Sequence, residues 1–158
     1  MEKVFEFNLN VERGEPFPQM PVLHDCVIDE IFTRDGTLYI TSADVANHDY
    51  DYSDVVGFCA EKVQIEFIFD ESAECEVLVS KFFPKKQIKE KNKYGYGKRS
   101  NCYDIAEFTE IYKDYNLEML YNMVCYNQVN IYLAAHKKRM HEAEMHIFCS
   151  KVRYVFLN

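Results

Sequence analysis

Apolar and polar residues alternate with a period of two through much of the chain. Segments with this alternation cover residues 5–11, 37–41, 63–69, 75–79 and 129–135. Successive side chains of a β-strand point to opposite faces, so this pattern indicates strands with one buried face and one wet face. The pattern predicts a mainly β protein.

Residues 23–41 predict a β-hairpin. A strand-like run from residue 23 to 32 is followed by Asp35-Gly36 and then by the alternating segment 37–41. Aspartate and glycine supply the positive φ angles that a tight two-residue turn requires, and Asp-Gly is a strong short-range hairpin signal.

The last apolar segment changes phase. Apolar side chains occupy odd positions from residue 143 to 149 and even positions from 152 to 156. A slip of one residue would turn half of a strand outward unless an extra residue is absorbed. The pattern predicts one long strand with a bulge near Ser150 and Lys151, preceded by a turn at residues 137–139.

The remaining segments predict a short helix, a segment that fits either a helix or a strand, and three loops. Asp104 followed by Glu107 resembles a capping box, and the apolar residues after it fall on one helical face, which predicts a short helix. Residues 117–126 fit both a helix and a strand, and we favour the strand. Residues 14–21, 44–54 and 84–101 read as loops.

These elements predict a single domain over residues 1–158, mainly β or α+β in class. We expect an antiparallel sandwich or a partly closed barrel, with about eight strands and one short helix. With 48% hydrophobic residues, 12 Tyr and 12 Phe, the chain can build a substantial core.

The compartment follows from what the sequence lacks. No run approaches the roughly 20 apolar residues of a membrane-spanning helix, and the start does not resemble a signal peptide. We therefore expect a cytoplasmic protein with free thiols. Four cysteines lie on apolar faces, where cysteine fills a core: Cys26, Cys75, Cys125 and Cys149. Only Cys102, after Lys98 and Arg99, has the positive surroundings that a reactive thiolate needs, and without a partner base in the sequence we expect no reactive role for it.

Net charge limits the partners. The chain has 18 Lys and Arg against 26 Asp and Glu, a formal charge of −8, which disfavours general binding to nucleic acid or anionic lipid and favours a basic partner. The candidate partner-binding residues are Asp44, Asp49, Asp51 and Asp54. Their spacing does not match a calcium loop, so we expect no metal there.

One short segment has the opposite charge. Cations, aromatic residues and glycines interleave between residues 91 and 99, a composition that can stack bases and neutralise phosphates. The candidate anion-binding residues are Lys91, Lys93, Tyr94, Tyr96, Lys98 and Arg99. A solvated loop is the simpler interpretation, because the glycine spacing matches no known phosphate-binding motif.

Histidines offer candidate chemistry. His24 and Asp25 could form a dyad, but strand alternation would place them on opposite faces, so we expect a buried structural His24. His136 and His141 could meet across the turn between them, whereas His141 and His146 should point to opposite faces. Two ligands do not make a structural zinc site. We therefore expect no metal, no cofactor and no catalytic residues.

The strand at residues 24–31, with His24, Asp25 and Ile28 in an HD-x-x-I pattern, leads into the hairpin at 35–40. This opening resembles small uncharacterised bacterial β-rich families, some of which look like immunity proteins of polymorphic toxin systems. The charge of −8, the acidic segment and the lack of an assembled catalytic motif predict a non-enzymatic protein that binds a basic protein partner, and the resemblance implies that this partner is a toxin. The alternatives are a β-barrel that binds a small ligand and nucleic-acid binding through the Lys-rich segment.

Overall fold

A computed structural model describes most of the chain. The described residues are 2–21, 23–43, 61–69, 75–83 and 97–157. The strands are β1 (Lys3–Asn8), β2 (Cys26–Arg34), β3 (Thr37–Ala43), β4 (Lys62–Ile68), β5 (Cys75–Phe83), β6 (Gly97–Asp104), β7 (Asn116–Cys125), β8 (Gln128–His136), β9 (Met140–Phe148) and β10 (Lys151–Leu157), and the helix is α2 (Ile105–Tyr112).

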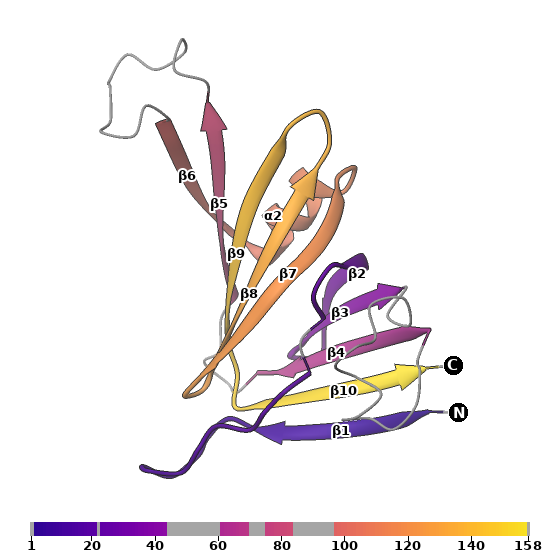
Figure 1. Cartoon of the computed structure of the whole chain (residues 1–158), viewed down its shortest axis with the longest axis vertical. Helices are drawn as coiled ribbons and strands as arrows, with labels where there is room; N and C mark the ends of the chain where they lie inside the picture. The colour runs from indigo at the N-terminus through magenta and orange to yellow at the C-terminus, as the bar shows by residue number, and fades with distance from the viewer. Residues whose placement is uncertain (1, 22, 44–60, 70–74, 84–96, 158) are drawn as a thin grey trace.

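All ten strands form one antiparallel sheet in the order β1-β10-β4-β3-β2-β7-β8-β9-β5-β6. We call β1, β10, β4, β3 and β2 the lower half, and β7, β8, β9, β5 and β6 the upper half. Among the described strands, the one pairing between the halves is that of Cys26–Ile28 of β2 with Leu117–Met119 of β7. The sheet bends sharply there, so its two halves face each other (Figure 1). This confirms the predicted antiparallel β architecture with one short helix.

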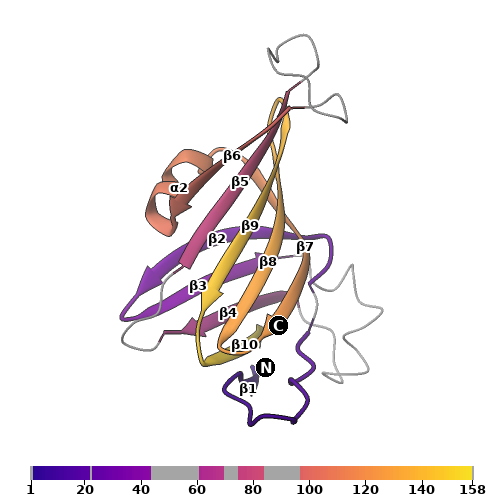
Figure 2. The ribbon, with the colours of Figure 1, turned by 90° about the vertical axis from the view of Figure 1, so that its left-hand side faces the viewer.

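The core lies between the two halves. The inward side chains of both halves are almost fully buried, among them Leu38 and Ile65 from the lower half and Ile131 and Met145 from the upper half. Helix α2 lies on the inner side of the upper half, toward β2, and buries Phe108 and Tyr112 there (Figure 2). The arrangement is sandwich-like, and the described sheet does not close into a barrel because β1 and β6 are its two edges.

The predicted hairpin and helix are confirmed at residue level. Asp35 and Gly36 have φ angles of 50° and 70°, and Arg34 pairs with Thr37 across them. The Asp104 side chain accepts a hydrogen bond from the Glu107 backbone, and the Glu107 carboxylate accepts one from the Asp104 backbone. Both features are local, which explains why the sequence predicts them well.

Residues 117–126 form a strand up to Cys125, as favoured. A register shift between Met119 and Tyr121 interrupts the pairing of β7 with β8. The extra residue reverses the faces of the strand, so that Asn122 and Val124 point inward while Tyr121 and Cys125 point outward. The prediction that Cys125 fills the core is therefore wrong.

The other cysteines lie as follows. Cys26 and Cys149 are buried in the core, and Cys75 packs partly buried against it. Burial, together with the nearby Cys149, raises the pKa of the Cys75 thiol to about 12. The five described cysteines form no disulfide, and Cys102 is exposed on β6.

Two predictions about strands are wrong. Residues 97–101 are not loop but belong to β6, which pairs with β5 along its whole length. The phase change near Ser150 is not a bulge, because β9 ends at Phe148 and β10 begins at Lys151 as a separate strand. Strand β9 pairs with β8 and β5, whereas β10 pairs with β1 and β4, so the chain crosses between the halves at this point. These two changes give ten strands instead of about eight.

Within the described residues, no helix is long and apolar enough to cross a membrane.

Candidate functional site

The outer side of β7, β8, β9 and residues 76–80 of β5 carries carboxylates, and no Lys or Arg is described among the outward positions of this region. The register of β7, β8, β9 and β5 places Glu118, Glu142, Glu144 and Glu76 on this side. We call this surface the acidic face; it is turned toward the viewer in Figure 2.

Large apolar side chains are exposed on the acidic face. Tyr121, Met123, Met140 and Phe148 occupy outward positions and are 38–48% exposed. The outward side of a half-buried sheet is normally polar, so these side chains leave an apolar surface beside the carboxylates. Exposed apolar surface bordered by charge is typical of an interaction site.

The centre of the acidic face is a hydrogen-bonded group of three side chains. The Tyr132 hydroxyl donates to Glu144 Oε1 at 2.8 Å, and His146 Nε2 lies 2.8 Å from the same oxygen. The hydrogen bond to the carboxylate, more than burial, raises the pKa of Tyr132 to about 12. The Tyr121 ring stacks on Tyr132 with centroids 4.2 Å apart. These contacts fix the Glu144 carboxylate in one position.

A pocket of about 330 Å³ opens beside this group. Leu78 and Ser80 of β5, the Tyr121 and Tyr132 rings, and the side chains of Glu142 and Glu144 are among the residues that line it. The β7 bulge contributes Leu120 to the same wall. The pocket therefore combines aromatic walls with two carboxylates, a combination that suits a cationic or polar side chain.

Histidines are the ionic partners of these carboxylates. His136 Nε2 lies 2.9 Å from Glu118 Oε2, in the same manner as His146 beside Glu144. Glu76 and Glu142 are exposed and form no ion pair with a described residue. Because Glu76 and Glu142 add two carboxylates without an ionic partner among the described residues, the acidic face carries an excess of negative charge.

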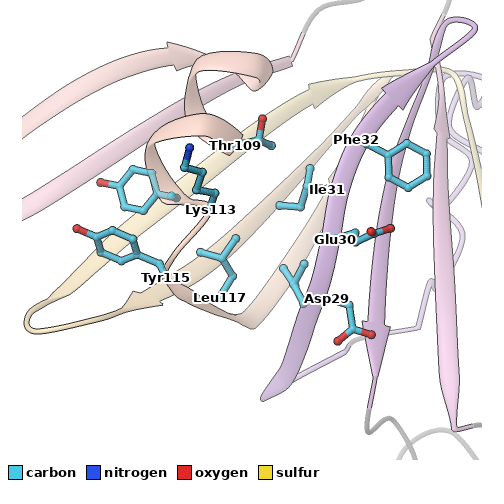
Figure 3. Close-up of a pocket in the computed structure, with 10 residues that line it drawn as sticks. Asp29, Glu30, Ile31, Phe32, Thr109, Lys113, Tyr115 and Leu117 are labelled. Atoms are coloured by element: carbon cyan, nitrogen blue, oxygen red, sulfur yellow. The ribbon is translucent and has the colours of Figure 1, made fainter.

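A second surface feature lies at the free edge of β2, where a groove of about 500 Å³ separates this strand from α2 and the residues that follow it. Residues 28–32 form one wall, and Thr109, Lys113, Tyr115 and Leu117 belong to the other (Figure 3). We call it the β2 groove. Behind Tyr115, the Tyr112 hydroxyl is 2.9 Å from His141 Nδ1, and burial raises the pKa of Tyr112 to about 12.

Most of the candidate residues from the sequence are not among the residues that the structure describes. Asp44, Asp49, Asp51, Asp54, Lys91, Lys93, Tyr94 and Tyr96 lie outside the described residues. Lys98 and Arg99 fall within β6, opposite Phe82 and Lys81 of β5, so their backbone belongs to the sheet edge instead of a loop.

The predictions for His24 are wrong. His24 and Asp25 do meet, with Nδ1 and Oδ2 2.8 Å apart, and the His24 side chain is 64% exposed. The reason is local: β2 begins at Cys26, and Asp25 adopts a φ of 61° in the turn before it. The strand alternation that would separate the two side chains does not apply there.

The other histidines are separated by the sheet. His136 lies opposite Met140, and His141 lies opposite Ala135, so His136 and His141 occupy opposite faces and do not meet. His141 and His146 also occupy opposite faces, as predicted. In the part of the chain that the structure describes, no three His, Cys, Asp or Glu side chains come together in a way that could hold a metal ion.

Sequence reasoning missed the Tyr132 and Glu144 pair, although a signal was present. A turn at residues 137–139 places His136 opposite Met140. Counting back along an antiparallel pair then puts Tyr132 opposite Glu144, on the polar phase of both strands. The turn predicted from the sequence was therefore sufficient to derive the register of β8 and β9.

Comparisons with known proteins give no further guide, since no family model, no curated protein and no solved structure matches this chain.

Proposed function

We propose that this chain is a protein-binding domain whose acidic face docks a basic partner. The observation that supports it is the set of outward carboxylates on β7, β8, β9 and residues 76–80 of β5, none of which pairs with a Lys or Arg among the described side chains. Complementary charge accelerates association and selects the partner. The resemblance of the first hairpin to immunity proteins gives one class of partner, a basic toxin domain.

The exposed apolar residues support the same proposal. Charge steers two proteins together, but buried aromatic and methionine side chains supply much of the binding free energy. Tyr121 and Met123 lie beside the carboxylates, and the pocket between Tyr132 and Glu142 offers a recess for a partner side chain. A Lys or Arg there would meet both an aromatic ring and a carboxylate.

The test uses two double variants of equal net charge. Glu76→Lys with Glu142→Lys changes the acidic face, and Glu12→Lys with Glu15→Lys changes exposed residues of the segment between β1 and β2. Each immobilised protein is incubated with lysate of the native host at low and high salt, and the recovered proteins are quantified. We expect a basic protein to bind the original chain and the Glu12/Glu15 variant at low salt, and not the acidic-face variant.

Two results would contradict the proposal. One is equal recovery of the same basic protein by both double variants, which would show that net charge alone attracts it. The other is the absence of any basic protein that the original chain retains at low salt and releases at high salt. Cross-links between the recovered protein and residues of β7 or β9 would locate the contact independently.

A further inference from the structure

Strand β2 has an unpaired edge. Strand β7 pairs with β2 only from Cys26 to Ile28, because β7 begins at Asn116 and the chain before it comes from α2. From Glu30 to Arg34, β2 pairs with β3 on one side. No described strand pairs with the other side of this stretch.

The hairpin turn identifies which backbone groups are free. A two-residue turn makes its flanking residues, Arg34 and Thr37, a hydrogen-bonded pair, and Phe32 with Tyr39 follows in the same phase. The N–H and C=O groups of Ile31 and Thr33 therefore point away from β3. No described backbone group binds them.

Ile31 lines the β2 groove, and Thr33 follows it on the same strand edge. Figure 3 shows the Ile31 side chain directed toward Thr109 and Leu117, while the side chains of Glu30 and Phe32 point the other way. Glu30 and Phe32 nevertheless line the groove, so they contribute backbone atoms to its wall. A groove between a strand edge and a helix, with exposed strand backbone, is the geometry of recognition by strand addition.

The charges beside the β2 groove favour a basic polypeptide segment as its occupant. Asp29 and Glu30 are exposed and form no ion pair with a described residue. The cation on the opposite wall, Lys113, is already held by Glu110 at 2.6 Å. A second copy of this chain would bring a formal charge of −8 toward another −8, whereas a basic segment is attracted.

We propose that the β2 groove binds an extended, basic segment of another polypeptide, which adds to β2 as a strand. Its apolar side chains lie on the side of Ile31 and Leu117, and its Lys or Arg side chains alternate with them on the side of Glu30. The proposal goes beyond docking on the acidic face, because that face is on the outer side of the upper half and the groove is on the side of α2. Either can fail without the other.

The first test measures amide hydrogen exchange by NMR with a defined probe, the capped peptide Lys-Val-Lys-Val-Lys-Val-Lys. Strand addition gives the Ile31 and Thr33 amides a new hydrogen bond, so we expect their exchange to slow about tenfold at saturation. The Phe32 amide is the internal control, since it already bonds to β3 and should change little.

Variants then test the mode of binding. Thr33→Pro removes one edge donor, and proline is tolerated where the N–H faces out of the ladder. We expect it to abolish peptide binding, while the matched Thr33→Ala retains it. Glu30→Lys should weaken binding about fivefold, and Glu12→Lys should leave it unchanged. The exchange pattern and the Glu30→Lys result decide the question even if Thr33→Pro does not fold.

Three results would overturn the proposal. The first is that the Ile31 and Thr33 amides do not exchange more slowly with about 1 mM peptide present. Binding with a Kd weaker than about 1 mM would be too weak to count as recognition. The second is equal slowing with the acidic peptide Glu-Val-Glu-Val-Glu-Val-Glu. The third is self-association in sedimentation experiments that protects the same amides without peptide, which would make a second copy the occupant.

Discussion

The outer face of the lower half and the acidic face are produced by the same strand alternation, yet they hold their carboxylates differently. In the lower half, Arg153 contacts Glu66 at 2.7 Å and Glu6 at 3.8 Å, and Lys151 contacts Glu6 at 3.0 Å. In the upper half the carboxylates contact histidine and tyrosine. Glu6 and Glu66 of the lower half are thus paired with Lys or Arg, whereas the described carboxylates of the acidic face are not.

The aromatic residues repeat this contrast. On the lower half, Phe32 stacks on Tyr39 at 4.8 Å, and the Arg34 guanidinium lies 5.3 Å from the Tyr39 ring centre. On the acidic face, Tyr121 stacks on Tyr132 beside a pocket with no cation among the described residues that line it. The lower half already contains the cation–aromatic contact that the acidic face lacks. The aromatic stack of the lower half has a cation from the chain itself, whereas the stack of the acidic face has none among the described residues of its pocket.

The largest effect on stability should come from the lower half. Arg153→Met leaves the Glu66 carboxylate, only 12% exposed, without its ionic partner, and we expect a loss of about 1–3 kcal/mol. On the acidic face, Glu142→Gln removes no partner and should change stability by less than about 0.5 kcal/mol. Urea unfolding of both variants measures the difference, and equal losses would remove the contrast between the faces.

Loss of a stacked ring should cost about 1 kcal/mol on either face, because the two stacks have similar geometry. Tyr121→Ala and Phe32→Ala are the matched pair, with stability measured by urea unfolding. They should differ in partner binding, which only Tyr121→Ala weakens. If Phe32→Ala reduced capture of the basic partner as strongly, docking would not be confined to the acidic face.

A smaller effect at neutral pH concerns Tyr132. Its raised pKa means that the bond to Glu144 stabilises the fold below about pH 10 and that this stabilisation is lost as the pH rises through about 12. Glu144→Gln removes the charge that keeps the proton on the phenol, so the pKa of Tyr132 should fall toward the ordinary value near 10.

Tyrosinate absorbance during an alkaline titration follows this change. A Tyr132→Phe variant isolates the Tyr132 signal from that of the other tyrosines, among which Tyr112 also titrates near pH 12. An alkaline titration that is identical before and after Glu144→Gln would show that the carboxylate does not control this phenol.

The smallest predicted effect is a pair of changes in unfolding free energy that have opposite signs. Glu142→Lys places a cation next to Glu144, two residues along the same face of β9, and should stabilise the protein by a few tenths of a kcal/mol. Lys151→Glu places a carboxylate beside Glu6 and should destabilise it by a similar amount. Thermal unfolding at low salt measures both changes, and high salt should reduce them. The same sign for both variants would refute the proposed charge difference.

The sequence predicted the features whose cause is local. The hairpin follows from Asp35-Gly36, and the start of α2 from Asp104 and Glu107, because these signals lie within a few residues of what they produce. The alternating strands were also predictable, since each buries one face. Strand β6 was not, because residues 97–104 do not alternate apolar with polar residues, and backbone bonds to β5 place them at the sheet edge.

The features that depend on pairing between distant strands could not be predicted from the sequence. The change of phase after Cys149 is visible in the sequence, but a bulge and a passage between two halves give the same pattern. The lack of Lys and Arg among the described side chains of the acidic face depends on which strands are neighbours, and β5 lies beside β9 although more than fifty residues separate their sequences. The β2 groove depends on where β7 begins, which no local signal in β2 indicates.

The place of β10 also sets an order of folding. It lies between β1 and β4, so the lower half lacks its connecting strand until residues 151–157 are available. The meander of β7, β8 and β9 needs only nearby residues and can form early. Closure of the β1 and β10 pair spans nearly the whole chain, so we expect it to be a slow, late event on which the lower half depends.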